Sequence, residues 1–332
     1  MMESVENRET DCEKGRRAME LTYATTKETK TAKKSKLFRK DGIKLLLMAL
    51  PFVAIAFAFS YVPLFGWIYA FFDYRPGIPL SRSEFVGLDH FAAMFTDTRM
   101  GPVLTNTLAL SLLSIATAPI PMLFAIMVSE VKNEWFKRIV QTTSTLPHYI
   151  SWIIVYSLAF SMFSTEGAVN SILFKLGLSD TPVNVLGNYE RVWTVQTLLL
   201  LWKGIGWSAI IYLAAIVSID SEQYDAARVD GAGRLRTIWH ITLPSIMPTF
   251  IVLLLLSISN LLSAGFEQYL VFSNVMVADR IEVLDLYVYR LGLVTGDYSY
   301  STAVGIFKSV ISIVLLFSVN FLSKKVRGQG IV

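Results

Sequence analysis

The chain contains six long stretches that are almost free of Asp, Glu, Lys and Arg. Each is near or above the ~20 residues that an α-helix needs to cross ~30 Å of hydrocarbon. The stretches are Leu45–Phe72, Met100–Ser129, Ile139–Thr165, Val192–Ile219, Ile241–Phe266 and Tyr298–Ser323, of which the fourth and the last carry one lysine each, Lys203 and Lys308. This pattern predicts an all-α integral membrane protein with six transmembrane helices.

Composition and charge support the membrane assignment. Of the 332 residues, 53% are hydrophobic and 17% charged, whereas an average soluble chain is about one quarter charged. The net charge of +4 arises entirely within residues 1–40, which hold eleven Lys and Arg against seven Asp and Glu. A polar segment of this kind buries too little apolar surface to fold. We therefore expect a disordered tail over 1–40 and a six-helix domain over 41–327, and we expect no nucleic-acid binding, which requires a basic face on a folded domain.

The distribution of positive charge predicts the orientation of the spans. Segments on the side of the termini carry 21 Lys and Arg, and segments on the other side carry 7. Short loops rich in Lys and Arg stay in the cytoplasm. Both termini are therefore expected to be cytoplasmic.

Residues 220–248, between the fourth and fifth stretches, carry local signals for a helix, a turn and a second helix. Asp220 is suited to cap a helix N-terminus. Gly231 is suited to the left-handed conformation that ends helices, because it has no Cβ. A second short helix is expected over Leu235–Ile241, before Pro244. The segment should form a compact helix-turn-helix on the cytoplasmic side.

The same segment resembles a known family motif. Its Asp225-Ala226-Ala227, Asp230-Gly231-Ala232, Ile241, Leu243-Pro244 and Pro248 are similar to the E-A-A loop of the membrane subunits of binding-protein-dependent ABC importers, with Asp225 in place of the usual Glu. Three further strings, Trp202–Trp207, Gly265–Gln268 and Tyr287–Arg290, resemble the branch that imports oligosaccharides. In this family the loop docks into a cleft on a separate ATPase. The resemblance assigns this contact to Glu222, Tyr224, Asp225, Ala226, Ala227, Asp230, Gly231, Ala232, Leu243 and Pro244.

The resemblance also implies function and partners. The chain would be a multi-pass permease subunit in the bacterial inner (cytoplasmic) membrane. It would work with two ATP-binding cassette ATPase subunits, a second homologous permease in a heteromeric pair and an extracytoplasmic solute-binding protein. It would itself be no enzyme and bind no cofactor, with ATP and Mg²⁺ on the ATPase. Consistent with this, the sequence contains no G-x-x-x-x-G-K-[ST] phosphate-binding loop, and its single cysteine and scattered histidines give no metal site.

One lysine within the fourth stretch is the first candidate for substrate contact. Lys203 is predicted to lie near the middle of the bilayer, where charged groups usually face a cavity or a partner. Aromatic faces beside a hydrogen-bond donor suit a sugar, and an ammonium group would favour acidic sugars. Pairing of Lys203 with a carboxylate of a second subunit, or with helix carbonyls, remains open. The pathway candidates are Trp202, Lys203, Trp207, Asn260, Ser263 and Glu267.

A second functional class stays open from the residues alone. An ion-coupled secondary transporter would use Lys203, Lys308 and Glu267 as coupling charges and would need no ATPase. That alternative leaves the resemblance of the 220–248 segment unexplained.

Overall fold

The computed structural model describes residues 40–327, in two units that divide between Gly66 and Trp67. The expected tail over 1–40 therefore lies outside the described residues, apart from Lys40. In the first unit, helix α2 (Lys40–Ser60) contains Pro51 and exposes apolar side chains such as Phe52 and Phe59. Such a helix matches the predicted first span.

The second unit is almost entirely helical. Its helices are α3 (Asp89–Thr96), α4 (Met100–Thr117), α5 (Pro119–Ser129), α6 (Glu134–Tyr149), α7 (Trp152–Phe163), α8 (Ala168–Lys175), α9 (Val192–Val217), α10 (Ser221–Val229), α11 (Arg234–Thr237), α12 (Leu243–Ser259), α13 (Glu267–Phe272), α14 (Ala278–Ile281), α15 (Leu284–Tyr289) and α16 (Tyr298–Arg327). Short 3-10 and π segments join them: η2 (Val62–Phe71, which begins in the first unit), η3 (Leu80–Arg82), η4 (Ile238–Thr242) and η5 (Arg290–Val294). Strands β1 (Phe72–Asp73) and β2 (Glu84–Phe85) form a minimal antiparallel pair, with Phe72 opposite Phe85.

Within residues 40–327, six helical segments are long and apolar enough to cross a membrane, which confirms the predicted number. The third differs from the expected Ile139–Thr165. Residues 150 and 151 are extended and separate α6 from α7, so the third candidate span begins at Trp152. Pro147, in the last turn of α6, lacks the N–H of an intrahelical bond and weakens the helix there. A stretch without charges can therefore contain two helices.

The fifth span also differs from its prediction, and runs over Arg234–Ser259 instead of Ile241–Phe266. The expected second helix of the loop is not separate, because α11, η4 and α12 follow one another without a break. In η4 the Leu243 N–H donates to the Ile238 carbonyl, five residues earlier. This wider π turn precedes Pro244, which has no N–H to give to a regular helix. The span ends where Asn260 leaves helical geometry.

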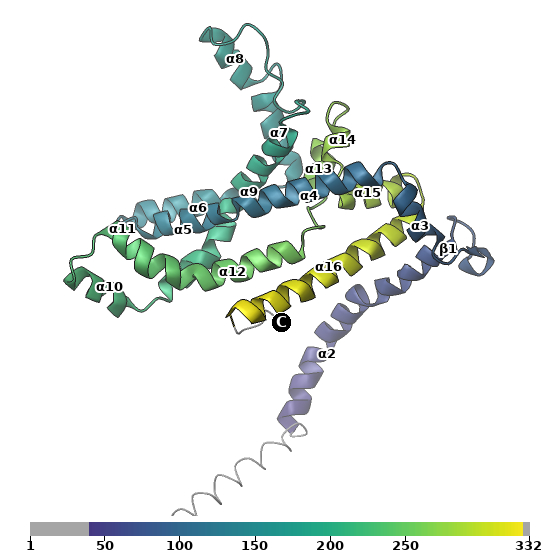
Figure 1. Cartoon of the computed structure of the whole chain (residues 1–332), viewed down its shortest axis with the longest axis horizontal. Coiled ribbons are helices and arrows are strands. Elements are labelled where there is room, and N and C mark those ends of the chain that lie inside the picture. The colour runs from purple at the N-terminus through teal and green to yellow at the C-terminus, as the bar shows by residue number, and fades with distance from the viewer. Residues whose placement is uncertain (1–39, 328–332) are drawn as a thin grey trace, which may run out of the picture. The chain divides into compact units, whose positions relative to one another are not determined.

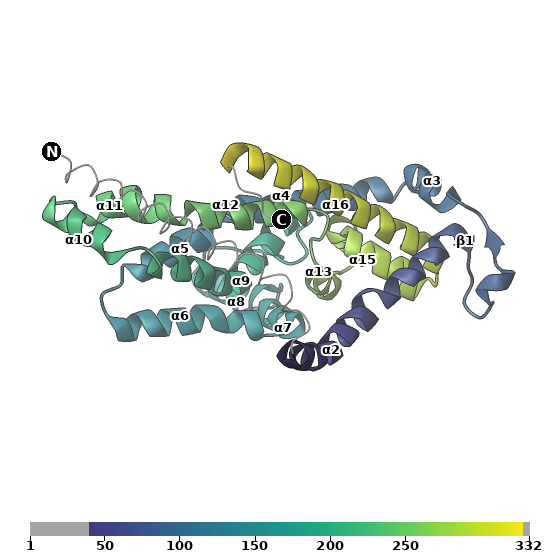
Figure 2. The same cartoon turned by 90° about the horizontal axis from the view of Figure 1, so that it is seen from below.

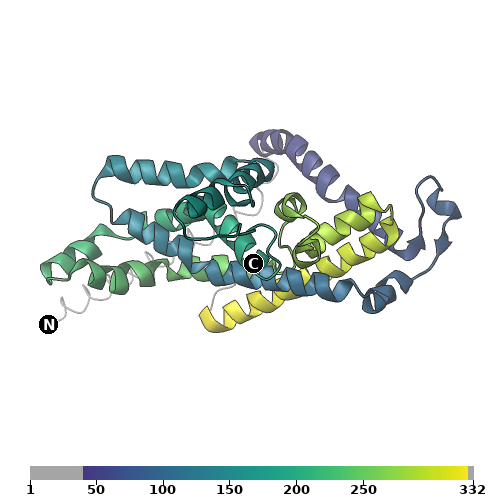
Figure 3. The same cartoon turned by 90° about the horizontal axis from the view of Figure 1, so that it is seen from above.

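Helix α9 is the centre of the second unit and packs against α4, α5, α6 and α12 (Figure 1). Helix α6 runs along α9 and α5 (Figure 2), and α12 lies beside α16. Figure 3 shows α4 and α5, in blue, running along this unit. One end of the unit carries α10 and α11, and the other carries α3 and α15.

Candidate functional site

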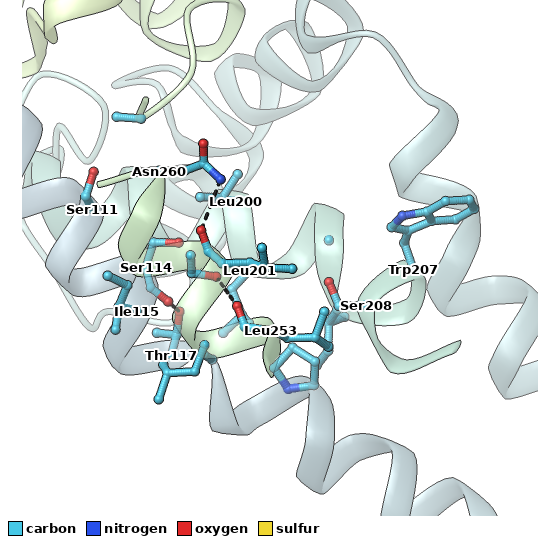
Figure 4. Close-up of a pocket in the computed structure, with 18 of the residues that line it drawn as sticks. Ser111, Ser114, Ile115, Thr117, Leu200, Leu201, Trp207, Ser208, Leu253 and Asn260 are labelled. Atoms are coloured by element: carbon cyan, nitrogen blue, oxygen red, sulfur yellow. Dashed lines mark hydrogen bonds between the residues drawn. The ribbon is translucent and has the colours of Figure 1, made fainter. Parts of the chain in front are cut away.

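A cavity of about 570 Å³ lies among α4, α5, α9 and α12 (Figure 4). This volume is within the range of about 300–1,000 Å³ typical of ligand pockets. Its wall mixes aliphatic side chains with hydroxyl and amide groups, which belong to Ser111, Ser114, Thr117, Ser208, Tyr212, Ser257, Asn260, Ser263 and Tyr269. Such a wall can donate and accept hydrogen bonds without carrying charge.

Three of the six predicted pathway residues line this cavity: Trp207, Asn260 and Ser263. The Asn260 side-chain nitrogen donates to the Leu256 carbonyl at 3.0 Å, which leaves its side-chain oxygen as an acceptor. Trp202, Lys203 and Glu267 are not part of the lining. The structure therefore divides the predicted group in two.

Lys203 instead contacts the end of α6. Its ammonium group donates to the His148 carbonyl at 2.7 Å and lies 5.3 Å from the centre of the Trp152 ring. Trp207, one helical turn later on the same face, stacks on the His148 ring with centroids 4.5 Å apart. Lys203 thus donates a hydrogen bond to a carbonyl at the end of a helix of its own chain, at the break between α6 and α7.

The Trp202 side chain lies in different surroundings from that of Lys203. It lines an apolar pocket of about 430 Å³ between α7 and α9, together with Leu158 and Phe163. Successive helical residues are separated by ~100°, which explains why neighbours in the sequence face different surroundings. Glu267 begins α13, and its carboxylate attracts the Lys203 ammonium electrostatically.

Helix α10 and the turn after it have the predicted geometry. The Asp220 carboxylate accepts the Glu222 backbone N–H at 3.0 Å, which confirms Asp220 as the N-cap. Gly231 has φ of +73°. The Gly231 N–H donates to the Arg228 carbonyl and the Ala232 N–H to the Ala227 carbonyl, which is the Schellman arrangement that ends helices.

Side chains fix α10 and expose its surface. The Tyr224 hydroxyl bonds the buried Thr242 hydroxyl at 3.1 Å, and so ties α10 to η4. Asp225 and Arg228 form an exposed ion pair at 2.9 Å. The knob, defined here as residues 220–239, also exposes three large apolar side chains, Val229, Leu235 and Trp239, at 89%, 83% and 68%.

The ten residues assigned to the ATPase contact do not share one surface. Glu222, Asp225, Ala226, Asp230 and Gly231 are exposed on the knob. Leu243, in contrast, packs against the buried cluster around Ile246, because it lies on the core side of the first turn of α12.

Sequence reasoning missed the buried amides near the opposite end of the unit. The Gln268 side-chain nitrogen donates to the carbonyl and side-chain oxygens of Gln196, at 2.9 and 2.8 Å. Asn106, which is 2% exposed, donates to the carbonyls of Asp279 and Glu282. A polar amide inside an apolar stretch is the signal that could have found them, because a buried amide requires partners.

Two polar clusters also stabilise this end. Lys308 of α16 forms an ion pair with Asp285 of α15, and both side chains are 21% exposed. The Asp97 carboxylate accepts hydrogen bonds from the Tyr287 and Tyr300 hydroxyls. Burial raises the pKa of Asp97, but these bonds, the Arg99 backbone N–H and the Arg99 charge outweigh burial and hold the pKa below its usual value. For Tyr287, burial and the adjacent Asp97 raise the pKa.

Comparison with known proteins identifies the family. Residues 117–328 match the family described as the inner membrane component of binding-protein-dependent transport systems. The chain belongs to this family. It is therefore a multi-pass permease of the inner membrane and a subunit of an ABC importer, whose ATPase is a separate subunit and whose membrane component binds no cofactor.

Several named proteins are similar to this permease. It is 42% identical over 86% of its length, and 89% of the relative's, to the polygalacturonan/rhamnogalacturonan transport system permease YteP of Bacillus subtilis. It is 30% identical over 89% of its length, and 93% of the relative's, to the arabinooligosaccharide permease AraP of the same organism. The permease also resembles a chain of a bacterial ABC transporter that imports the acidic polysaccharide alginate, with a TM-score of 0.78 and 36% identity over 87% of this chain and 97% of the other. Membership in this family excludes the alternative that the chain is an ion-coupled secondary transporter.

Proposed function

We propose that this permease passes an oligosaccharide through the cavity among α4, α5, α9 and α12, and that the knob couples the passage to ATP hydrolysis. One observation carries the proposal. Helix α12 contributes Leu253, Leu256 and Ser257 to the cavity wall, Asn260 follows at its C-terminal end, and in the other direction α12 continues through η4 into α11 of the knob. A rigid movement of the knob would therefore change the cavity directly.

The chemistry of the wall favours a polyhydroxylated substrate. Hydroxyl and amide groups can exchange hydrogen bonds with sugar hydroxyls, and the 44% exposed Trp207 offers a flat face to a pyranose ring. The names of the relatives agree, since they refer to polygalacturonan, arabinooligosaccharides and alginate. Lys203 and Glu267 have a different role in this proposal: Lys203 holds the end of α6 against α9, and Glu267 balances its charge.

The exposed surface of α10 is the proposed ATPase contact. Ala226 and Ala227 are small enough for close approach of a partner, and the exposed apolar side chains of the knob supply area to bury. Asp225 is paired with Arg228, so its charge is partly compensated before any partner binds.

Assembly and orientation belong to the same proposal. The knob and both termini lie in the cytoplasm, as the charge distribution predicts. Residues 41–327 form the membrane domain, and a second homologous permease closes the pathway in a heteromeric pair. Two ATPase subunits bind the two knobs, and an extracytoplasmic binding protein delivers the sugar at the opposite end.

ATPase activity of the reconstituted complex tests coupling. Gly231→Val forces a β-branched residue into φ of +73°, whereas Gly233→Ala changes a glycine with φ of −72° and no atom within 4 Å of an added Cβ. We expect Gly231→Val to abolish sugar-stimulated hydrolysis and ATPase assembly while the permease stays inserted, and Gly233→Ala to preserve both. Equal activity of the two variants, or solute movement without any ATPase, would overturn the proposal.

A further inference from the structure

A second, larger cavity lies at the end of the unit that is opposite to the knob. It has a volume of about 1,140 Å³ and is lined by the first turns of α4, by the α14–α15 region and by Tyr189. The α4–α5 pair runs between the two ends: Arg234 of the knob approaches Glu130, just after α5, at 3.8 Å, and α4 begins at the other end (Figure 1). By the proposed orientation, this second cavity faces the side from which solute arrives.

The lining combines cations with aromatic side chains. Three arginines, Arg99, Arg280 and Arg290, meet two acids, Asp279 and Glu282. The lining also includes three tyrosines, Tyr189, Tyr287 and Tyr289, together with the polar Thr105 and Asn106. The cavity therefore carries an excess of one positive charge.

The arginines of the lining differ in their ionic contacts. Arg290 pairs with Glu282 at 2.6 Å and donates to the Ser273 hydroxyl at 2.8 Å, so this pair is neutral. Arg280 forms no salt bridge with any residue in the described part of the chain. Its guanidinium carbon lies over two rings, 3.7 Å from the Trp193 centroid and 5.5 Å from the Tyr189 centroid.

Arg280 is suited to bind a planar anion. Its guanidinium lies over aromatic rings, and guanidinium N–H donors fit a carboxylate in a bidentate geometry. Arg99 is exposed and belongs to the same lining.

We propose that this cavity binds the uronate residues of an acidic oligosaccharide, with Arg280 and Arg99 receiving the sugar carboxylates and the tyrosine rings receiving the sugar faces. The inference rests on the proposed function and makes it more specific, because a neutral sugar would leave Arg280 without an anion. The volume exceeds that of a typical single-ligand pocket, so more than one sugar ring can enter.

Equilibrium binding to the permease complex without its binding protein tests this site. The complex is held in nanodiscs of zwitterionic lipid, so that anionic headgroups cannot occupy the cavity. The probes are a fluorescent trigalacturonate and its carboxyl-reduced, neutral counterpart. The variants are Arg99→Gln and Arg280→Gln, and the control is Arg191→Gln, which removes an exposed arginine that does not line this cavity.

We expect each cavity variant to weaken binding of trigalacturonate about tenfold or more, the usual effect of losing a charge-assisted contact. Binding of the neutral probe should change less than twofold, and the control should affect neither. An unchanged affinity for trigalacturonate, or an equal loss for both probes, would overturn the uronate site while leaving the coupling result for Gly231→Val intact. Failure of the wild-type complex to respond to any saccharide would instead contradict the proposed function.

Discussion

Gly206 marks the closest approach of α9 to α6, and replacing it should separate the two helices. An added Cβ would lie 2.2 Å from the Ser144 carbonyl oxygen and 2.6 Å from the Thr145 nitrogen. Ordinary contact begins near 3.4 Å, so the backbones must move apart by about 1 Å. Because the obstacle is backbone on both sides, no side-chain rotation can relieve it.

The expected cost follows from that clash. Overpacking of a tightly packed contact costs roughly 1–3 kcal/mol, and Gly206→Ala belongs at the upper end. Alanine has a higher helix propensity than glycine, which stabilises the helix by about 0.5–1 kcal/mol. The net loss of stability is therefore about 2 kcal/mol. The matched control is Gly204→Ala in the same helix, where an added Cβ meets nothing within 4 Å. It should be neutral or slightly stabilising.

Thermal unfolding of the purified permease in one detergent distinguishes the two variants. At roughly 2–4 °C per kcal/mol, Gly206→Ala should unfold at least about 5 °C below Gly204→Ala. Unfolding temperatures within 1 °C of each other would refute the close α6–α9 contact. The contact matters for the site because α6 carries His148, the partner of Lys203 and Trp207.

Three further predictions concern single contacts. Tyr224→Phe removes the bond to Thr242, which contributes about 1 kcal/mol, and should increase tryptic cleavage at the knob arginines; unchanged cleavage would contradict a tether at this position. Because the pKa of Asp97 is lowered in the folded state, its ionised carboxylate stabilises the fold fully above pH 3.8. This contribution to the free energy of unfolding is lost as the pH falls through the pKa of the folded state. Asp97→Asn should therefore lower the unfolding temperature at pH 6, with a difference from wild type that shrinks below pH 3.8, and a constant difference would argue against the Asp97 cluster. Lys308→Met should lower the stability of the permease by about 1–3 kcal/mol, and the double variant Lys308→Met/Asp285→Leu should lower it by less, as measured by thermal unfolding. If the double variant lost the sum of the two single losses, the ion pair would be excluded.

The spans and the knob could be predicted because their signals are local. A run of residues without charges indicates a membrane span. The Asp220 carboxylate caps the first turn of α10, and Gly231 permits the left-handed conformation that ends this helix. Each signal depends only on residues a few positions away. The boundaries that failed, at α6–α7 and at both ends of the fifth span, depend on the extended residues 150 and 151, on the π turn η4 and on the departure of Asn260 from helical geometry. A charge count registers none of these.

The contacts of the predicted pathway residues were only partly predictable, for a different reason. The sequence indicated that Lys203 was unusual but not what it contacts, since His148 lies 55 positions away. Trp202 and Trp207 looked equivalent as neighbours of Lys203, yet helical rotation places them in different pockets.

The sequence by itself thus determined an all-α membrane chain with six spans and a capped knob between the fourth and fifth spans, because hydrophobic runs, capping residues and turn glycines act through their nearest neighbours. Only the tertiary structure decided that Trp207, Asn260 and Ser263 share one cavity, and that Arg99 just before α4, Arg280 of α14 and Arg290 just after α15 share another. Cavities arise from faces of helices that are distant in sequence, and the packing of those faces depends on contacts such as that of Gly206 with the α6 backbone.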